Sequence, residues 1–155
     1  MRIPQLFVVI AAMLAAVTVT SAQEKPNFSG RWVVVSPAAD AGQEQTVTQT
    51  AATLTTGHAS EGHGHRAVYK LDGTENRNVL TSHDEDIVTL SKASWSGTQL
   101  TITSDTTYPD GRKWHTVQTW SLESEGRLAV EFSETGMNAA PTTTRRIYTR
   151  RQPPA

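Results

Sequence analysis

The sequence predicts an all-β fold, an antiparallel up-and-down meander of about 8–10 strands that closes into a barrel. Three observations support this prediction. After the N-terminal segment, no window repeats apolar residues at the spacing of an amphipathic helix over three turns. Apolar and polar residues alternate instead, and threonine, which strands favour, recurs along the chain. Glycine-containing turn sequences divide the alternating segments at short, fairly even intervals.

The first 22 residues are predicted to be a secretory signal peptide. Arg2 supplies a positive charge, Leu6 to Val19 form an apolar run, and Thr20-Ser21-Ala22 places small residues at a cleavage site. The run is too short to be preferred as a membrane span. We therefore expect a signal peptide over 1–22 and one lipid-free domain over 23–155. The short alanine-rich leader is typical of bacteria, so the mature protein is expected to be periplasmic or extracellular, without a membrane anchor.

Each expected strand has one buried face and one face toward solvent. Leu100 and Ile102 alternate with threonines, and Leu128, Val130 and Phe132 share a face in the same way. In a further segment two tryptophans, at positions 114 and 120, lie on one face. In chain order the expected strands cover residues 31–36, 44–49, 53–58, 64–71, 77–81, 87–95, 98–106, 112–123, 127–135 and 142–149.

The turns between these strands carry glycine where a tight turn needs a positive φ, as in Asp72-Gly73, Ser96-Gly97, Asp110-Gly111 and Glu125-Gly126. Hairpins therefore join consecutive strands into a long meander. A flat meander would leave both edge strands unpaired. Closing into a barrel removes these edges, and folding over as a sandwich is the alternative. We expect the barrel, because sequential hairpins produce it without long crossovers.

Composition excludes several classes of function. The formal net charge of the whole chain is −1, and loss of Arg2 makes it slightly more negative, so there is no basic field for nucleic acid. The chain has no cysteine, so stability must come from a core rather than from disulfides. It has neither a Gly-x-Ser-x-Gly elbow nor a glycine-rich phosphate loop. We therefore expect a protein that is not an enzyme.

The stretch Pro26-Asn27-Phe28-Ser29-Gly30-Arg31-Trp32 directly follows the expected signal peptide. It resembles the F-S-G-x-W opening of small exported bacterial proteins that are mostly uncharacterised and described as lipocalin-like. The resemblance continues through Val47 to Gln49, Tyr69 to Gly73, Trp95 to Gly97, Thr119 to Leu122 and Arg146 to Arg150. It implies a lipocalin-like barrel with an internal cavity. It also implies structural roles for Gly30, which would let the chain turn in tightly, and for Trp32, which would pack across the barrel floor.

A histidine-rich segment lies between the third and fourth expected strands. With Ala59 to Gly62 as the loop, we expect His58 and His63 to face each other across a hairpin. His63 and His65 would lie on one side of an extended segment, roughly 6–7 Å apart at Cα. With His58 or Glu61 as a third ligand, His63 and His65 could hold Zn²⁺, Cu²⁺ or Ni²⁺ and leave one position open. The same residue types are ordinary in a solvated loop, and we favour that interpretation.

The large aromatic rings suggest a second kind of site. Tyr69, Trp95 and Trp114 are our candidates for contacts with a small apolar or amphipathic ligand inside the barrel. Trp95 and Trp114 lie near strand ends, where they could guard a barrel mouth, although such rings can also simply fill the core. The leading hypothesis is therefore an exported binding module of unknown specificity. The alternative is a metal-binding protein that uses the loop from His58 to His65.

Overall fold

The computed structural model describes residues 24–60, 63–136 and 140–151, with positions 59, 60, 63 and 64 described by their backbone alone. The expected signal peptide over 1–22 lies outside these residues. The described part folds into ten strands and two short 3-10 helices. In chain order they are β1 (Gly30–Ser36), η1 (Ala38–Asp40), β2 (Glu44–Gln49), β3 (Thr53–Ser60), β4 (His63–Lys70), β5 (Asn76–Ser82), β6 (Glu85–Ser96), β7 (Gln99–Thr107), β8 (Lys113–Leu122), η2 (Ser124–Gly126), β9 (Leu128–Gly136) and β10 (Thr142–Arg150).

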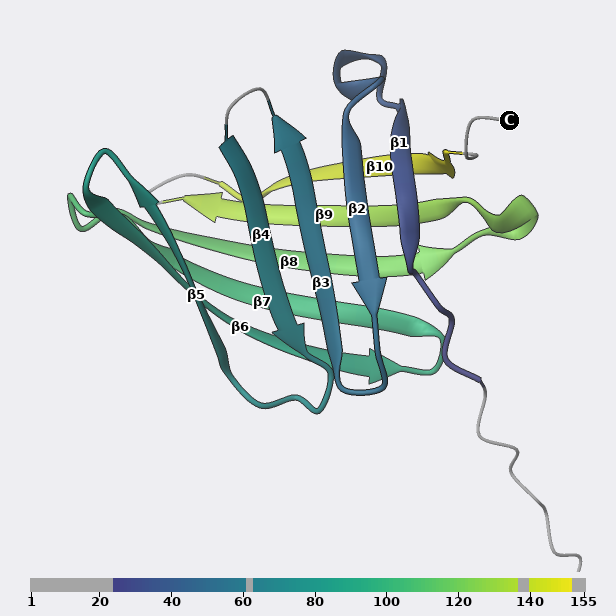
Figure 1. The fold of residues 1–155 in the computed structure, drawn as a ribbon, viewed down its shortest axis with the longest axis horizontal. Coiled ribbons are helices and arrows are strands. Elements are labelled where there is room, and N and C mark those ends of the chain that lie inside the picture. The colour runs from purple at the N-terminus through teal and green to yellow at the C-terminus, as the bar shows by residue number, and fades with distance from the viewer. Residues whose placement is uncertain (1–23, 61–62, 137–139, 152–155) are drawn as a thin grey trace, which may run out of the picture.

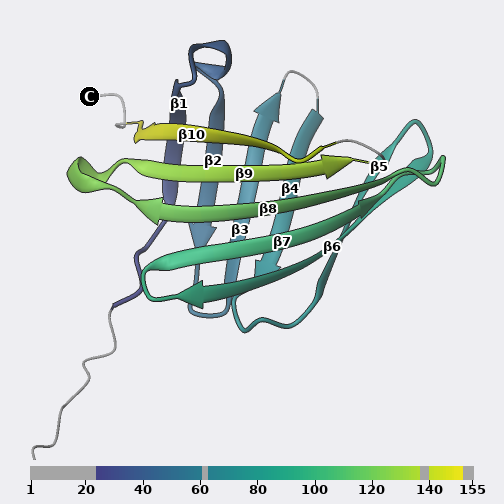
Figure 2. The same cartoon turned by 180° about the vertical axis from the view of Figure 1, so that it is seen from behind.

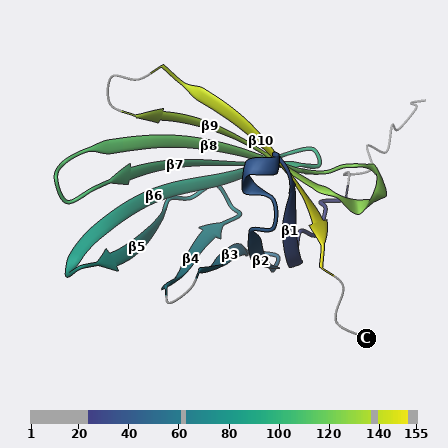
Figure 3. The same ribbon diagram turned by 90° about the horizontal axis from the view of Figure 1, so that it is seen from above.

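All ten strands belong to one antiparallel sheet, in the order β4-β3-β2-β1-β10-β9-β8-β7-β6-β5. Every neighbour in this order is also a neighbour in sequence, except that β1 pairs with β10. The layer of β1 to β4 crosses the layer of β6 to β10, as Figures 1 and 2 show from opposite sides. Seen from above, the sheet curls into a nearly closed barrel (Figure 3). The predicted up-and-down, lipocalin-like barrel is confirmed.

The expected strands all occur, and the main differences lie at two hairpins. β3 continues to Ser60 and β4 starts at His63, so strand pairing extends into the segment that was expected to be a loop from Ala59 to Gly62. β6 starts two residues earlier than expected, at Glu85, because His83 and Asp84 adopt φ values of 52° and 65°. Two successive positive φ values are the requirement of a tight two-residue hairpin turn.

The core lies at the end of the barrel where the chain enters β1, which we call the closed end. Thirteen apolar side chains form one buried cluster there and in the middle of the barrel: Phe28, Trp32, Val34, Val47, Leu54, Tyr69, Ala93, Leu100, Ile102, Trp120, Leu128, Val130 and Tyr148. They come from nearly every strand, since each strand contributes alternate residues to the inside.

The segment before β1 covers the closed end. The Phe28 ring is fully buried, stacks on Trp95 at 5.7 Å between ring centroids and meets Trp120 edge-on at 5.8 Å. Its backbone is fixed as well, because its N–H donates to Oε1 of Gln49 at 2.9 Å and its carbonyl accepts from Nε1 of Trp32 at 2.8 Å. The segment is therefore part of the barrel and forms its floor.

Gly30 sits where the floor segment turns into β1. Its φ is 150°, and a Cβ there would lie only 2.9 Å from Nη1 of Arg150. The Arg150 guanidinium covers the Trp32 ring at 4.6 Å and donates to the carbonyl of Ser29 at 2.7 Å. A side chain at position 30 would displace this arginine, which gives a physical reason for glycine at this position.

The two edge strands, β4 and β5, meet at a seam without backbone pairing between them. A side chain takes the place of the missing strand contact. Asn78 accepts from the Val68 N–H through Oδ1 and donates to the Val68 carbonyl through Nδ2, both at 2.9 Å. Asn76 also donates to that carbonyl, at 2.5 Å. The barrel is thus held shut at the peptide of Val68 by asparagine amides.

Candidate functional site

A cavity of about 420 Å³ opens behind the β4–β5 seam, at the end of the barrel opposite the floor. One wall comes from β3 and β4 and the other from β5 and β6. Polar and apolar side chains share the lining, which consists of Thr56, His58, His65, Arg66, Ala67, Tyr69, Asn78, Val79, Leu80, Ile87 and Thr89. Its volume falls within the range of about 300–1,000 Å³ that is usual for small-molecule sites. This cavity is the candidate binding site.

His58 and His65 face each other across β3 and β4 at the open end. The expectation that His58 would face His63 is wrong, because the register of β3 and β4 pairs His58 with His65 and His63 with Ser60. Partial burial lowers the pKa of His58 below its ordinary value, and the positive charge of Arg146 and the nearby His65 lower it further. The imidazole of His58 is therefore held toward its neutral form.

The metal hypothesis stays a prediction. His58 and His65 lie together on the cavity wall, whereas Glu61 and the side chain of His63 lie outside the described part of the chain. Among the described residues, no group of three or more histidine, aspartate or glutamate side chains is arranged to hold a metal ion. The charge of Arg146 near His58 opposes the binding of a cation there.

Arg146 is paired inside the open end. Its Nε donates to Oδ2 of Asp40, in η1, at 2.8 Å, and both side chains are largely shielded from solvent. Its guanidinium also lies over the Phe132 ring at 5.0 Å. η1 thus supplies a counter-ion for a cation that β10 points toward the barrel interior.

The interior toward the open end is lined with paired hydroxyl and amide groups. Ser91 and Ser104 are buried and share a hydrogen bond of 2.8 Å, and the hydroxyls of the neighbouring pair Thr89 and Thr106 lie 3.0 Å apart. Burial raises the pKa of Tyr69, whose hydroxyl is hydrogen-bonded by the side chains of Thr56 and Gln118. The interior therefore changes from an apolar floor to a polar open end.

Two buried side-chain nitrogens in the described residues have no hydrogen-bond partner, Nε2 of Gln45 and Nε of Arg127. Gln45 lies on the inner face of β2 and is 4% exposed. Sequence reasoning missed it, together with Arg146, Asp40 and Asn78. The sequence did carry a signal for Gln45 and Arg146, because each shares a strand face with an apolar residue. Gln45 shares its face with Val47 in β2, and Arg146 shares its face with Tyr148 in β10.

The three predicted ligand contacts lie at different places. Tyr69 lies on the cavity wall. Trp114 is at the open end, 40% exposed, with its ring against the position of Gly136. Trp95 is at the closed end, stacked on Phe28, and does not line the cavity. The structure thus gives Trp95 a packing role in the floor, while ligand contacts by Tyr69 and Trp114 stay predictions.

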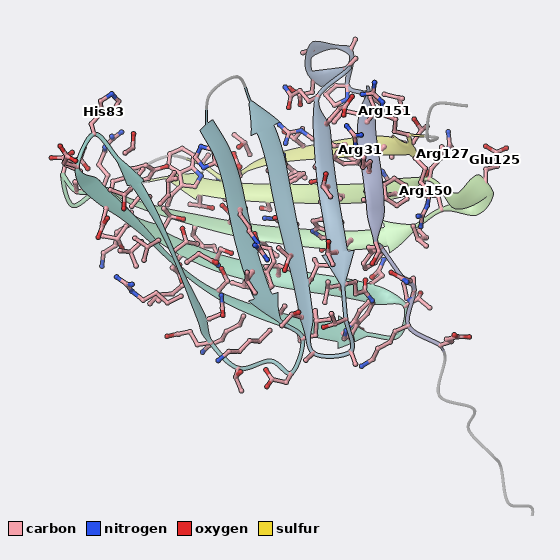
Figure 4. All side chains as sticks on the ribbon, viewed as in Figure 1. Arg31, His83, Glu125, Arg127, Arg150 and Arg151 are labelled. Carbon is pink, nitrogen blue, oxygen red and sulfur yellow. The ribbon has the colours of Figure 1, made fainter. Side chains whose placement is uncertain are left out.

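Other surface features are less suited to binding. A more open hollow of about 540 Å³ lies on β2 to β4; its lining consists of Thr46, Thr48, Thr55, Gly57, His58, His65 and Arg66, so the two histidines border both hollows. Figure 4 shows Arg31, Arg127, Arg150 and Arg151 gathered at one side of the molecule, opposite His83 on the β5–β6 hairpin. Several of these arginines pair with carboxylates; Glu44, for example, binds both Arg31 and Arg151. The described residues contain no helix with the length and hydrophobicity that crossing a membrane requires.

These features define a ten-stranded lipocalin-like barrel with a cavity at its open end. No protein-family model and no curated protein matches the sequence. Two solved structures share the fold. Human cRBP IV aligns with a TM-score of 0.53 and 14% identity over 81% of this chain and 99% of that chain. A secretary abundant heat soluble (SAHS) protein from Ramazzottius varieornatus aligns with a TM-score of 0.52 and 9% identity over 84% of this chain and 100% of that chain.

Proposed function

We propose that the protein is an exported binding module that holds one small amphipathic molecule in the cavity behind β4 and β5. The observation that carries this proposal is the cavity itself. It has room for a small organic molecule, and it lies where the apolar floor gives way to a polar open end. Export rests on the expected signal peptide over residues 1–22.

The chemistry of the lining supports an amphipathic ligand rather than a purely apolar one. Ala67, Leu80 and Ile87 offer an apolar surface, whereas Thr56 and Thr89 place hydroxyl-bearing side chains at the same cavity. An apolar molecule would leave polar groups without water, and a fully polar one would gain nothing from the apolar surface. A molecule with one end of each kind satisfies both parts.

The structural neighbours agree with a binding role. Human cRBP IV and the SAHS protein share the barrel fold at low sequence identity. The fold leaves the choice of ligand to the side chains, so the ligand of this protein follows from its own cavity.

The proposal is tested by titrating the purified protein with Nile red, a fluorescent amphipathic dye. We expect saturable binding with an increase in dye fluorescence. In the Ala67→Phe variant the added ring enters the cavity, and the affinity should fall by at least about tenfold. The matched control, Thr55→Phe, places the same ring on the outer face of β3 and should bind like the wild type.

The two variants separate the cavity from the rest of the surface. Equal binding by wild type and Ala67→Phe, with both proteins folded by circular dichroism, would place the dye elsewhere and contradict the proposal. Loss of binding in both variants would instead indicate a site on the outer face of β2 to β4, where the more open hollow lies.

A further inference from the structure

The cavity behind β4 and β5 is lined by basic side chains and by no acidic ones. Its basic residues are His58, His65 and Arg66, and no aspartate or glutamate of the described part of the chain belongs to its lining. The same three residues border the more open hollow outside, whose described lining also lacks carboxylates. The whole chain has 14 lysines and arginines against 15 aspartates and glutamates, so this local excess of basic groups distinguishes the cavity from the average of the protein.

Arg66 lies at the mouth of the cavity. Ala67 and Tyr69 face the cavity from β4, and residues that alternate along a strand point to opposite sides, so Arg66 starts from the outer face. β4 is one edge of the curled sheet and borders the seam with β5 (Figure 3). The side chain of Arg66 is exposed and is also part of the cavity lining. A ligand at the mouth can therefore contact its guanidinium.

The guanidinium of Arg66 has no carboxylate partner among residues 24–60, 63–136 and 140–151. Arg146, the other arginine near this site, differs in this respect, because Asp40 accepts from its Nε at 2.8 Å. Most other arginines in these ranges also pair with a carboxylate, namely Arg31, Arg112, Arg127, Arg145 and Arg151. Arg66 thus supplies positive charge that a ligand can neutralise.

The two histidines add hydrogen-bond donors beside this charge. His65 precedes Arg66 in β4 and pairs with His58 across β3 and β4. Partial burial, Arg146 and His65 lower the pKa of His58, in that order of importance. A neutral imidazole still carries one N–H donor, and a protonated one carries two donors and a positive charge. In either state the histidines favour an anion at the mouth over a cation.

The distribution of polarity decides how an anionic molecule would lie. An ionised group deep inside the barrel would lose its water at a high cost, whereas a group at the exposed mouth keeps part of its hydration. The apolar side chains of Leu80 and Ile87 line the cavity from β5 and β6. The volume of about 420 Å³ lies toward the lower end of the usual range for small-molecule sites, which suits one chain rather than several.

We propose that the ligand is a single-chain amphipath with an oxyanion as its head group, bound at the mouth by Arg66 and by the histidines His58 and His65. Its apolar chain then lies along Leu80 and Ile87. The planar guanidinium can donate two parallel hydrogen bonds to the two oxygens of one such head group. This inference rests on the proposed function and names the ligand class for the same cavity.

The experiment compares four probes with the same ten-carbon chain by displacement of Nile red at neutral pH. Decanoate and decyl sulfate carry an oxyanion, decylammonium carries a cation, and decanol is the uncharged reference. We expect the wild type to bind each anion at least about tenfold more tightly than decylammonium. The tighter of the two anions identifies the head group.

Variants of Arg66 test its part in this preference. In Arg66→Glu the affinity for both anions should fall about tenfold and the affinity for decylammonium should rise, while decanol changes less than twofold. Arg66→Gln removes the charge without reversing it and should lower the affinity for the anions about three- to fivefold, as expected for an ion pair at an exposed site. Arg77→Glu makes the same change in charge at an exposed position of β5 outside the cavity lining and should change each affinity less than twofold.

A second pair of variants tells the cavity from the outer hollow, because Arg66 borders both. Ala67→Phe, which fills the cavity, should weaken decanoate at least about tenfold, whereas Thr55→Phe, on the outer face, should leave it unchanged. Weakening of decanoate by Thr55→Phe alone would place the anion on the outer hollow and overturn the inference.

Two other results would also overturn the inference and leave the binding module standing. The first is decylammonium bound as tightly as both anions in the wild type. The second is unchanged affinity for both anions in Arg66→Glu that circular dichroism shows to be folded. Nile red that does not bind to the wild type would overturn the proposed function itself. Preference for the anions that is lost in Arg66→Glu and kept in Arg77→Glu would support both proposals.

Discussion

Removal of the Phe28 ring should open the floor of the barrel. The ring is fully buried and contacts two tryptophans, Trp95 and Trp120, at centroid distances of 5.7 and 5.8 Å. Truncation of a buried phenylalanine to alanine costs about 3–5 kcal/mol in proteins. Because Phe28 belongs to a segment that enters the sheet only at Gly30, the rest of that segment should detach with it. We expect Phe28→Ala to lower the free energy of unfolding by about 4 kcal/mol.

The assay is urea unfolding followed by tryptophan fluorescence. With a denaturant slope of about 2 kcal/mol per molar urea, this loss moves the unfolding midpoint down by about 2 M. A second signal comes from the native state without urea. Detachment of the floor segment exposes the Trp95 ring to water, so the emission of the folded variant should shift to longer wavelength.

Two controls define the prediction. Phe28→Leu keeps much of the volume but loses the stacking, and should cost less than half as much as the alanine variant. Val35→Ala removes a side chain that is 47% exposed on β1 and should change stability by less than about 0.5 kcal/mol. A loss below about 1 kcal/mol in Phe28→Ala, with unchanged native emission, would show that the segment before β1 does not form the floor.

Four further measurements test other parts of the structure. Asn78→Ala should lower the free energy of unfolding by about 1–3 kcal/mol and speed hydrogen exchange of the Val68 amide, because that peptide loses its partner at the seam. Ser91→Ala should cost stability by leaving the Ser104 hydroxyl buried alone, whereas the double alanine variant should be no less stable than the single one in urea melts. Burial holds the pKa of Tyr69 above its ordinary value near 10, so with rising pH the tyrosine hydroxyl loses its proton in the unfolded chain before it does so in the folded one. The free energy of unfolding should therefore fall as the pH rises above about 10, and this fall should be less steep in Tyr69→Phe. A modest excess of Zn²⁺ should shift the melting temperature by less than about 1 °C, because the described part of the loop supplies two imidazole ligands beside a positive charge; a rise of several degrees would favour the metal hypothesis.

The strands were predictable because their signal is local. Alternation with a period of two marks each strand in its own sequence, and glycine or a short polar turn marks its end. The hairpin that contains His58 shows the limit of prediction from local patterns. The register depends on where pairing ends, and because β3 and β4 pair as far as Ser60 and His63, His58 faces His65 rather than His63.

The site depends on contacts between residues that are far apart in the sequence. The Asp40–Arg146 ion pair joins η1 to β10, which no local pattern indicates. The same holds for Trp95, which lies near a strand end as expected but is covered by Phe28 from the segment before β1. An inward-facing polar residue such as Gln45 breaks the alternation of its strand without saying what it binds. The pattern therefore locates such residues, and only the closed barrel shows which of them have partners.

The two ends of the barrel have different roles: the closed end stabilises the fold, and the open end holds the candidate binding cavity. At the closed end the chain covers its own core with aromatic rings and buried backbone hydrogen bonds, so the floor needs no ligand to be complete. At the open end the interior also carries polar side chains, among them the hydrogen-bonded pairs Thr89–Thr106 and Ser91–Ser104. The floor should therefore govern stability, and the side chains of the open end should govern which molecules the cavity accepts.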